Sequence, residues 1–306
     1  MNERRQLLIA SALLAIACAL AFSPDAFVPM MARAFLCWWS IAFMGLTLLA
    51  LCKRAWWIAV CSMLCAPMVW PTVAVPVVEL SQEPSAHRIR VAHLNVLQPN
   101  MRHADAVRSI IESGADVVSV QEVGPEWASA LREGLREEYQ HFIIVPRTNC
   151  YGIALFSKLP VAHAEPLLVA GTTMLHAEVM VGEERVRVYA VHATSPGGFG
   201  HYRRRNAQLA ELADRVSAHA GPVLVVGDLN TVHWDDAYRR LCARSGLRPV
   251  NPSSLVTWPS LGPLAFIPLD HALVAGGLLP SAINSFRIKG SDHRGIITDL
   301  HIAHAS

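Results

Sequence analysis

Residues able to do acid–base chemistry follow an apolar stretch in the middle of the chain. Residues 223–226 are all apolar, and Gly227, Asp228 and Asn230 come directly after them in the segment PVLVVGDLNTVHW. A carboxylate only accepts hydrogen bonds, whereas an amide both accepts and donates. Because side chains alternate along a strand, Asp228 and Asn230 leave on one face if the backbone stays extended past Gly227. A polar turn that only caps the strand explains these few residues equally well.

Further polar residues stand at comparable positions. Each follows or closes a predicted strand, or directly precedes the last one: Asn95, Glu122, His192, Asp270, Asp292 and His293. Carboxylates and amides at several strand ends can converge on one rim, which suits a hard divalent cation such as Mg²⁺ because it takes oxygen ligands. Histidines beside carboxylates suit acid–base work. Each residue alone is more often a cap, a turn former or a core histidine, so only the combination predicts a site.

Alternating strands and helices must hold these residues. From the apolar patterning we expect strands at residues 88–97, 116–121, 141–145, 152–157, 174–181, 185–190, 223–226, 269–274, 283–288 and 295–302, and helices at 105–113, 125–138, 202–219 and 235–245. Such alternation is typical of an α/β domain, and about 220 residues suffice for one sizeable core. We therefore assign residues 89–306 to one catalytic domain.

The first 80 residues are much more apolar than the rest. The whole chain is 53% hydrophobic and 16% charged. Long uncharged runs occupy residues 7–22, 34–52 and 55–78. A membrane-spanning helix needs about 20 such residues, so we expect residues 1–80 to be an anchor of three transmembrane helices and residues 81–88 to be a polar linker. The first run, behind Arg4 and Arg5, also has signal-peptide character, but its removal would leave the other two runs.

Cations in the short loops predict how the chain is oriented in the membrane. Arg4 and Arg5 precede the first apolar run, and Lys53 and Arg54 separate the second run from the third. Because cytoplasmic loops carry an excess of Lys and Arg, the N-terminus and the loop at 53–54 should be cytoplasmic. The catalytic domain would then be extracytoplasmic. In a Gram-negative cell this describes a multi-pass protein of the inner membrane with a periplasmic domain.

Charge and cysteine content argue against other classes of protein. Residues 84–306 hold 21 Lys and Arg against 20 Asp and Glu, a net charge of +1. This is not the basic field of a protein that tracks a nucleic-acid backbone. Five of the seven cysteines lie in or beside the apolar runs, which leaves Cys150 and Cys242 in the domain. These two form neither a disulfide framework nor a zinc-binding spacing. Whether they pair stays open, and buried free thiols are the simpler expectation.

The set of polar residues resembles that of the endonuclease/exonuclease/phosphatase superfamily, and the apolar N-terminal part resembles that of its bacterial membrane-anchored members. The resemblance covers residues 88–302 and rests on Asn95, Gln121-Glu122, His192, the G-D-x-N segment at 227–230, Asp270-His271 and the S-D-H segment at 291–293. It implies a four-layer α/β sandwich, in which two packed mixed β-sheets are flanked by helices. It also implies metal-dependent hydrolysis of a phosphoester.

The resemblance assigns the metal site to three residues. Glu122 would be the main ligand of Mg²⁺, for which Mn²⁺ can substitute, with Asn95 and Asp292 close by. Leu97 departs from the pattern, because some members of the superfamily have a second acidic ligand at that place. This departure leaves open whether the site holds one metal or two.

The same resemblance assigns the catalytic steps. Asp228 would orient or deprotonate the attacking water, and Asn230 would hold that water and a phosphate oxygen. His293, paired with Asp270, would contact the phosphate and stabilise the developing charge. His192 would act on the leaving-group side. Metal and imidazolium would thus neutralise the phosphoryl oxygens while water attacks in line.

Two further residues are candidates for contact with substrate. Arg203 is the first of three consecutive arginines near the start of a predicted helix. Consecutive helix residues point in different directions, so at most one or two of the three can face a phosphate. Trp258 either offers an aromatic surface to substrate or packs its loop on the core. The expected partner is a phosphoester of a nucleic acid or a lipid head group, besides the bilayer itself, and no protein partner can be inferred.

The favoured function is a membrane-anchored, nuclease-like phosphodiesterase. The alternative in the same class is a phosphodiesterase of phospholipids or sphingomyelin-type lipids in the envelope, or a phosphomonoesterase. The alternative of another class is a membrane scaffold with an inactive hydrolase-like domain, against which the complete set of acids, amides and histidines argues. A transport or sensing module is disfavoured, because no ionisable Asp, Glu, His, Lys or Arg lies within the apolar runs.

Overall fold

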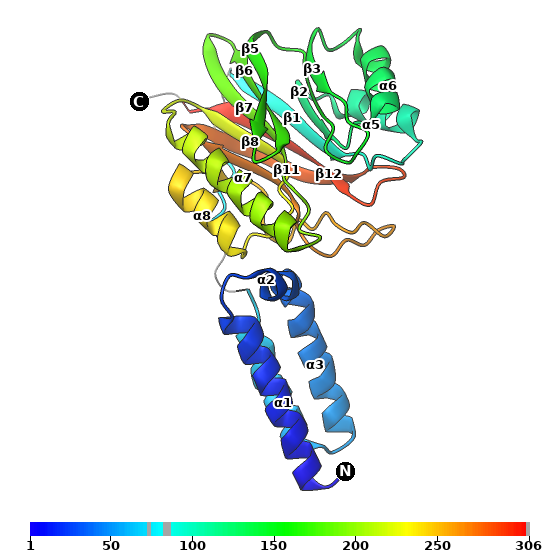
Figure 1. Cartoon of the computed structure of the whole chain (residues 1–306), viewed down its shortest axis with the longest axis vertical. Helices are drawn as coiled ribbons and strands as arrows, with labels where there is room; N and C mark the ends of the chain where they lie inside the picture. Colours follow the sequence, from blue (N-terminus) through cyan, green and yellow to red (C-terminus); the bar gives the residue numbers. More distant parts are fainter. Residues whose placement is uncertain (72–74, 82–86, 304–306) are drawn as a thin grey trace. The chain divides into compact units, whose positions relative to one another are not determined.

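The computed structural model describes residues 1–71, 75–81 and 87–303 (Figure 1). Most of the linker expected at 81–88 therefore lies outside the described residues. The chain forms two compact units. One comprises Met1–Ala74 with Trp234–Asp236, and the other comprises Val75–His233 with Ala237–Ser306.

The N-terminal unit is helical. Its helices are α1 (Glu3–Phe22), α2 (Phe27–Arg33), α3 (Leu36–Cys52) and α4 (Trp56–Met68). Residues of α1, α3 and α4 pack together around the small side chains of Ala50, Ala55 and Ala59. A hydrogen bond of 2.8 Å between Thr47 Oγ1 and Ser62 Oγ joins α3 to α4. Small residues and hydroxyl groups at helix contacts are typical of helices that pack in a bilayer.

The expectation of three membrane-spanning helices is not supported. Among the described residues, α1 alone is long and apolar enough to cross a bilayer unaided, and α2 with α3 qualifies only as one span broken by a bend of 61°. Helix α4 has 13 residues and ends at Met68, just past Pro67. At about 1.5 Å per residue it reaches about 20 Å, short of the roughly 30 Å hydrocarbon core. Prolines remove backbone donors, so the helix ends well before the apolar run does.

The larger unit contains two six-stranded sheets. Their strand orders are β11-β12-β1-β2-β4-β3 and β5-β6-β7-β8-β10-β9. The strands of the first sheet are β1 (Arg88–Asn95), β2 (Val117–Gln121), β3 (His141–Val145), β4 (Ile153–Ser157), β11 (Leu278–Arg287) and β12 (Arg294–Ile302). Those of the second are β5 (Val161–Val169), β6 (Thr172–Val181), β7 (Glu184–His192), β8 (Val223–Asp228), β9 (Arg248–Pro249) and β10 (Asp270–Ala275). Each sheet is mixed, because β1 pairs with β2 and β7 with β8 in parallel while their other neighbours are antiparallel.

Helices cover the outer face of each sheet. Helices α5 (His103–Ser113) and α6 (Pro125–Leu135) pack on the first sheet, and α7 (Phe199–Ser217) and α8 (Asp236–Ser245) pack on the second. Figure 1 shows the two helix pairs on opposite sides of the strands. A third cluster, made of side chains from both sheets, fills the space between them. Alternation along the strands produces these layers, since Val188 and Ala190 enter the middle core while Tyr189 and Val191 enter the helix-covered one. The expected four-layer α/β sandwich is confirmed.

Some elements differ from the sequence-based expectation. The apolar patterning of the sequence does not predict a strand at residues 161–169, yet these residues form β5. The reason is that β5 is an edge strand, where Pro166 and exposed polar side chains are tolerated because one side of the backbone needs no partner. Helix α7 begins at Phe199 rather than Tyr202, and β11 begins at Leu278 rather than Ile283.

Candidate active site

Polar residues replace apolar ones at the ends of the inward-facing rows of several strands. On β1, Val91 enters the core between the sheets, and His93 and Asn95 continue the same row. On β8, Val226 enters that core and Asp228 follows in its row. The same change occurs on β2, β7 and β10, at Gln121, His192 and Asp270. Because residues two apart share a face of a strand, these rows carry buried polar groups to one end of the middle core.

Strand pairing brings these ends together. Asn95 is aligned with Gln121 in the parallel pair β1–β2, and His192 with Asp228 in the parallel pair β7–β8. The antiparallel strand β10 begins where β8 ends, which aligns Asp270 with Asp228. Between the two sheets, Asn95 Nδ2 donates to Asp228 Oδ2 at 3.3 Å. The site therefore spans both sheets at the carboxyl ends of their parallel strands.

The carboxylate of Asp270 is held by two imidazoles. His93 Nε2 donates to Oδ1 at 2.6 Å, and His293 Nδ1 donates to Oδ2 at 2.8 Å. Burial opposes ionisation of Asp270, but the charge and hydrogen bond of His293, together with those of His93, lower its pKa. Burial likewise opposes the imidazolium form of His293, yet the charge of Asp270 beside it raises the pKa of His293 to about 10. At neutral pH the two form an ion pair with His293 protonated.

The carboxylate of Asp228 lies at the centre of the site. Its Oδ2 is 3.7 Å from His293 Nε2 and 3.7 Å from His192 Nε2. Its Oδ1 accepts the backbone N–H of Asn230 at 2.8 Å. Burial and the charge of Asp270 raise the pKa of Asp228 to about 7, although His293 opposes this. Asp228 can therefore exchange a proton near neutral pH, as a general base must.

The carboxylate of Glu122 is fixed at the same rim by groups from the end of β1. Asn95 Nδ2 donates to Oε1 at 3.1 Å, and the backbone N–H of Gln98 donates to Oε2 at 2.9 Å. Glu122 has a φ of 65° and Leu97 a φ of 61°. Residues other than glycine are uncommon in this left-handed region, because the conformation is strained for them. Such strained residues cluster at functional sites, where the surrounding structure holds the backbone in place.

The backbone stays extended only as far as Asp228 and then turns, so the condition for Asp228 and Asn230 to share a strand face is not met. Strand β8 ends at Asp228, and Asn230 has a φ of 48°. Asn230 still reaches the rim, because its N–H bonds Asp228 and its Nδ2 donates to the carbonyl of Ala193 at 2.9 Å. Gly227 is required here, since its φ is 151° and a Cβ would overlap the carbonyl of Val191 on β7.

The side chain of Asp292 is hydrogen-bonded to that of Trp258. Trp258 Nε1 donates to Asp292 Oδ2 at 3.0 Å, whereas Oδ1 is buried and has no hydrogen-bond partner among the residues that the structure describes. Ser291 Oγ donates to the carbonyl of Asn95 at 2.7 Å and so fixes this loop on β1. A buried carboxylate oxygen without a donor is costly, and a divalent cation with oxygen ligands would satisfy it. By donor type, Glu122, Asn95 and Asp292 fit such a cation.

A second group of possible ligands lies deeper in the site. One ligand atom from each of Asp228, Asp270 and His293 falls within 4.8 Å of the other two. Because Asp270 and His293 already form a hydrogen bond with each other, we interpret this group as acid–base machinery. Acidic groups that could hold a cation are therefore present in this deeper group as well as at the rim.

His192 is a buried, neutral imidazole. Burial, with a smaller effect from the charge of His293, lowers the pKa of His192 to about 3. Its ring centroid lies 5.6 Å from that of Tyr151, in the segment between β3 and β4. His192 can therefore exchange hydrogen bonds with a substrate but carries no charge of its own near pH 7.

The three consecutive arginines have different surroundings. Arg203 and Arg204 are exposed, and the guanidinium carbon of Arg203 lies 5.9 Å from the centroid of the Phe199 ring. Arg205 is buried, and its Nη1 donates to the carbonyl of Asn230 at 3.1 Å. Arg205 thus supports the turn that carries Asn230. Contact of Arg203 with substrate stays a prediction.

His93 and Arg205 are missing from the set of site residues predicted from sequence. His93 had a usable signal, because it precedes Asn95 by two residues and so shares its face of the strand. Arg205 had no such signal in the sequence, because its role is to bind the carbonyl of Asn230, 25 positions away in the chain. Cys150 and Cys242 are both free thiols, of which Cys242 is buried, as expected, and Cys150 is only partly buried.

A family model matches residues 92–293, from β1 to the histidine that Asp270 holds. The chain belongs to the endonuclease/exonuclease/phosphatase family. This confirms the resemblance of the domain, and the matched residues do not include the N-terminal helices. No curated protein matches the chain at a significant level.

Solved structures share the fold at low sequence identity. The endonuclease/exonuclease/phosphatase from Beutenbergia cavernae has 19% identity and a TM-score of 0.59, with 72% of each chain covered. TDP2 from C. elegans has 17% identity and a TM-score of 0.59, with 72% of this chain and 77% of that one covered. Sphingomyelinase C from Streptomyces griseocarneus has 19% identity and a TM-score of 0.55, with 71% and 99% covered. At these identities the likeness extends to the fold alone.

Proposed function

We propose that this protein is a divalent-metal-dependent phosphodiesterase that cleaves its substrate by in-line attack of an activated water. The observation that carries the proposal is the buried array in which Asp270 holds His293 and His293 faces Asp228 at 3.7 Å. The array places the imidazolium of His293 beside the carboxylate of Asp228, which can accept a proton near neutral pH. Membership of the family supports hydrolysis of a phosphoester as the class of reaction.

Glu122, Asn95 and Asp292 would hold the cation, for which Mg²⁺ or Mn²⁺ is the best match to oxygen ligands. When bound, the cation neutralises charge on the phosphoryl oxygens. Asn95 has a second task, because its Nδ2 lies between Glu122 Oε1 and Asp228 Oδ2, at 3.1 and 3.3 Å. The amide thereby keeps the two carboxylates at fixed positions and limits their mutual repulsion.

Asp228 would position and deprotonate the attacking water. Its Oδ1 is held by the backbone of Asn230, which leaves Oδ2 directed at the centre of the site between His192 and His293. A carboxyl group with a pKa near 7 combines a useful fraction of base with a strong tendency to take the proton. The side chain of Asn230 would hold the same water or a phosphoryl oxygen.

His293 would donate its Nε2–H to a phosphoryl oxygen. Asp270 accepts the Nδ1–H, which fixes the ring and keeps it protonated, and His93 fixes Asp270 from the other side. A preorganised cationic donor in a buried site stabilises developing charge far better than one in water. The neutral imidazole of His192 would hydrogen-bond the leaving-group oxygen.

A lipid phosphodiester is the second candidate substrate, and an exposed loop favours it. Leu261 and Leu264 pair through their backbones at the tip of the loop that follows Trp258, and their side chains are 60% and 61% exposed. The N–H of Ser260 donates to the carbonyl of Asp292 at 2.6 Å, so the tip is joined to the rim of the site. Apolar side chains exposed in this way can enter the interface of a bilayer. The near-neutral charge of the domain, in contrast, argues against tight binding to duplex DNA.

We also propose that the N-terminal helices hold the chain at a membrane, with the larger unit outside the cytoplasm. Helix α1 has the length and apolarity of a membrane span, with 17% of its most apolar window buried. Leu8 on α1 and Leu48 on α3 are each 66% exposed, as side chains in contact with lipid would be. Arg4 and Arg5 before α1 favour a cytoplasmic N-terminus.

A panel of phosphoesters tests the reaction and its substrate. The full chain in detergent would be offered plasmid DNA, RNA, phospholipid, sphingomyelin and p-nitrophenyl phosphoesters, each with Mg²⁺, Mn²⁺ or EDTA, and Asp228→Asn would serve as the inactive control. We expect metal-dependent cleavage of a diester that Asp228→Asn does not catalyse. Cleavage of nucleic acid in preference to lipid would exclude the second candidate. A folded chain that cleaves none of these esters with either metal would favour the inactive scaffold.

A further inference from the structure

Three side chains with metal-ligating groups meet on the outer face of the second sheet, away from the candidate active site. His163 and Glu165 lie on β5, and His176 lies directly opposite Glu165 on β6. Glu165 Oε1 is 3.5 Å from His163 Nε2 and 3.5 Å from His176 Nδ1. One ligand atom from each residue falls within 4.8 Å of the other two.

A β-bulge on the edge strand directly precedes this group and places His163 on the opposite face from Val161. Val161 pairs with Val179, but the next aligned residue of β5 is His163, which pairs with Glu178. Ala162 is therefore the extra residue. If a regular register continued from Val161, Ala162 would pair with Glu178 and His163 with Ala177, whose side chain lies in the core between the sheets. Bulges commonly re-aim a side chain in this way.

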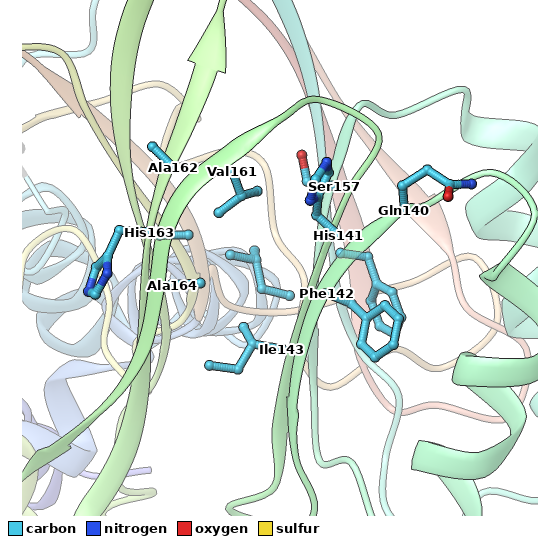
Figure 2. A pocket seen from close by; sticks show the side chains of 12 residues that line it. Gln140, His141, Phe142, Ile143, Ser157, Val161, Ala162, His163 and Ala164 are labelled. Atoms are coloured by element: carbon cyan, nitrogen blue, oxygen red, sulfur yellow. The ribbon is translucent and has the colours of Figure 1, made fainter.

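The pocket beside β5 shows the result of the bulge. It has a volume of about 540 Å³ and lies between β3–β4 and β5, and its lining residues include none of the predicted site residues. In Figure 2 the ring of His163 lies on the other side of the β5 ribbon from Ile143 and Phe142, which line the pocket. His163 is itself among the residues that line the pocket, and its Nε2 lies 3.5 Å from Glu165 Oε1.

The carboxylate of Glu165 is not neutralised by an arginine, unlike its neighbour on the same face. Glu178 is bound by Arg185 and Arg187, at 3.0 and 3.1 Å. Among the described residues, the ion-pair partners of Glu165 are His163 and His176 only. The carboxylate of Glu165 is thus shared by two imidazoles and forms no ion pair with Arg187, although the charge of Arg187 acts on His176.

The ring of His176 is held in place, whereas the other two side chains are accessible. His176 is 8% exposed and stacks on Tyr189, with ring centroids 5.0 Å apart and an angle of 27° between the planes. The side chains of His163 and Glu165 are 53% and 45% exposed. One ligand is therefore preorganised, and solvent can reach the site, as an entering ion and a bound water require.

We propose that His163 Nε2, Glu165 Oε1 and His176 Nδ1 bind one divalent transition-metal cation of the Zn²⁺ class, with water as a further ligand. Two imidazoles and a carboxylate suit Zn²⁺, whereas Mg²⁺ prefers oxygen alone. Ligands at 2.0–2.2 Å in a tetrahedron are separated by about 3.3–3.6 Å, and both distances from Glu165 Oε1 are 3.5 Å. The bound ion would fasten edge strand β5 to β6, independently of the candidate active site.

Metal binding by the full chain in detergent tests the proposal. Excess Mg²⁺ would be present throughout to occupy the oxygen-rich candidate active site. Zn²⁺ would be titrated and the bound ion measured by elemental analysis after gel filtration, and Co²⁺ would report coordination through the intense visible absorption of a four-coordinate centre. Melting temperature with Zn²⁺ and with EDTA gives a third readout. His163→Ala removes an exposed ligand, and His141→Ala removes a histidine of the facing edge strand β3 that is outside the cluster.

We expect the wild type and His141→Ala each to bind one Zn²⁺ more than His163→Ala. Their melting temperatures should rise when Zn²⁺ is added, because a ligand that binds the folded state stabilises it. His163→Ala should weaken binding by at least about tenfold, since even outer-shell partners of a metal contribute 10–100-fold. Its melting temperature in EDTA should equal that of the wild type. Equal binding by His163→Ala and the wild type, or equal losses in His163→Ala and His141→Ala, would overturn the assignment.

Discussion

Asp228 and Asp270 face each other in the register of β8 and β10, yet their carboxyl groups have opposite pKa shifts. Both are buried, which by itself raises the pKa of each. Asp270 receives hydrogen bonds from two imidazoles, which lower its pKa in spite of burial. The two imidazoles nearest Asp228 are farther away, at 3.7 Å, and burial with the charge of Asp270 raises its pKa to about 7 although His293 opposes this. When environments separate the pKa values of two acids in this way, one can serve as base while the other holds a charged partner.

The first prediction treats Asp228 and His293 as one catalytic unit. Asp228→Asn removes the proton acceptor, and His293→Ala removes the cationic donor. Each should lower the rate by about 10²–10⁴, the range of a positioned acid–base group or a charge-stabilising donor. Because groups that act in one step are not additive, the double variant should be little slower than the slower single variant. Turnover of all three variants, with melting temperatures, measures this.

If Asp228 and His293 only capped the backbone and took no part in catalysis, the three variants would give different results. Each single change would then cost about 1 kcal/mol of stability, the costs would add in the double variant, and turnover per folded molecule would be intact. Normal turnover in either folded single variant removes that residue from the mechanism.

The second prediction concerns the metal. Glu122→Gln keeps the shape of the side chain and removes the charge that a hard cation prefers. Activity should fall by orders of magnitude at limiting Mg²⁺, with the fold intact. Glu126→Gln, on the exposed first turn of α6, is the matched control and should behave like the wild type. Full activity of Glu122→Gln at limiting Mg²⁺ would show that another group binds the ion.

The third prediction concerns His93, which acts through Asp270 and does not reach the centre of the site itself. His93→Gln weakens the hold on Asp270 and so loosens the ring of His293. We expect kcat to fall by about 10–100-fold, as for comparable supporting partners, with KM little changed. His301→Gln, at a buried histidine on β12 of the same sheet, is the control. A lower melting temperature with unchanged kcat in His93→Gln would reduce its role to packing.

The fourth prediction is a loss of stability in acid that two other buried histidines cause. Burial lowers the pKa of His271 to about 3, with help from the charge of His233, and lowers that of His233 to about 4. Between about pH 4 and 6.5 the unfolded chain binds protons that the folded chain does not, so their contribution to stability falls as pH falls. Each group contributes a slope of about 1.4 kcal/mol per pH unit at most.

Comparison of variants isolates this effect from that of Asp228, whose raised pKa acts in the opposite direction over the same pH range. In the wild type, His233 Nε2 donates to the carbonyl of Asn251 at 2.9 Å. His233→Gln removes the titratable ring but keeps a side-chain donor for this carbonyl. Denaturant unfolding near pH 5, 6 and 7 should give a shallower pH dependence for His233→Gln than for the wild type. Parallel pH dependences would mean that His233 is protonated in the folded chain.

The fifth prediction is the location of the larger unit. If α1 crosses the membrane with Arg4 and Arg5 inside, an enzyme fused after Ser306 should be active only when it works outside the cytoplasm. A reporter that works only in the cytoplasm would instead favour an even number of crossings, as when α1 and the bent pair of α2 and α3 each span once.

The sequence by itself determined the class of fold and most of the candidate site. Apolar runs, interrupted by helical patterns, indicate where the buried strands lie, and this is local information. The residues Asn95, Glu122 and Asp228 could be selected because each stands where an apolar row ends. Their family resemblance depends on order and spacing, which the sequence contains in full.

The tertiary structure alone decided how those residues are paired and charged. Asp228 and Asp270 differ in pKa because of contacts between strands that are distant in the sequence, and no local pattern records such contacts. The same is true of the support that Arg205 gives to Asn230. The bulge at Ala162 depends on register, which a strand acquires only from its partner. The length of α4 was also decided by the structure alone. The third apolar run is long enough to span a bilayer, but the helix that it forms is not.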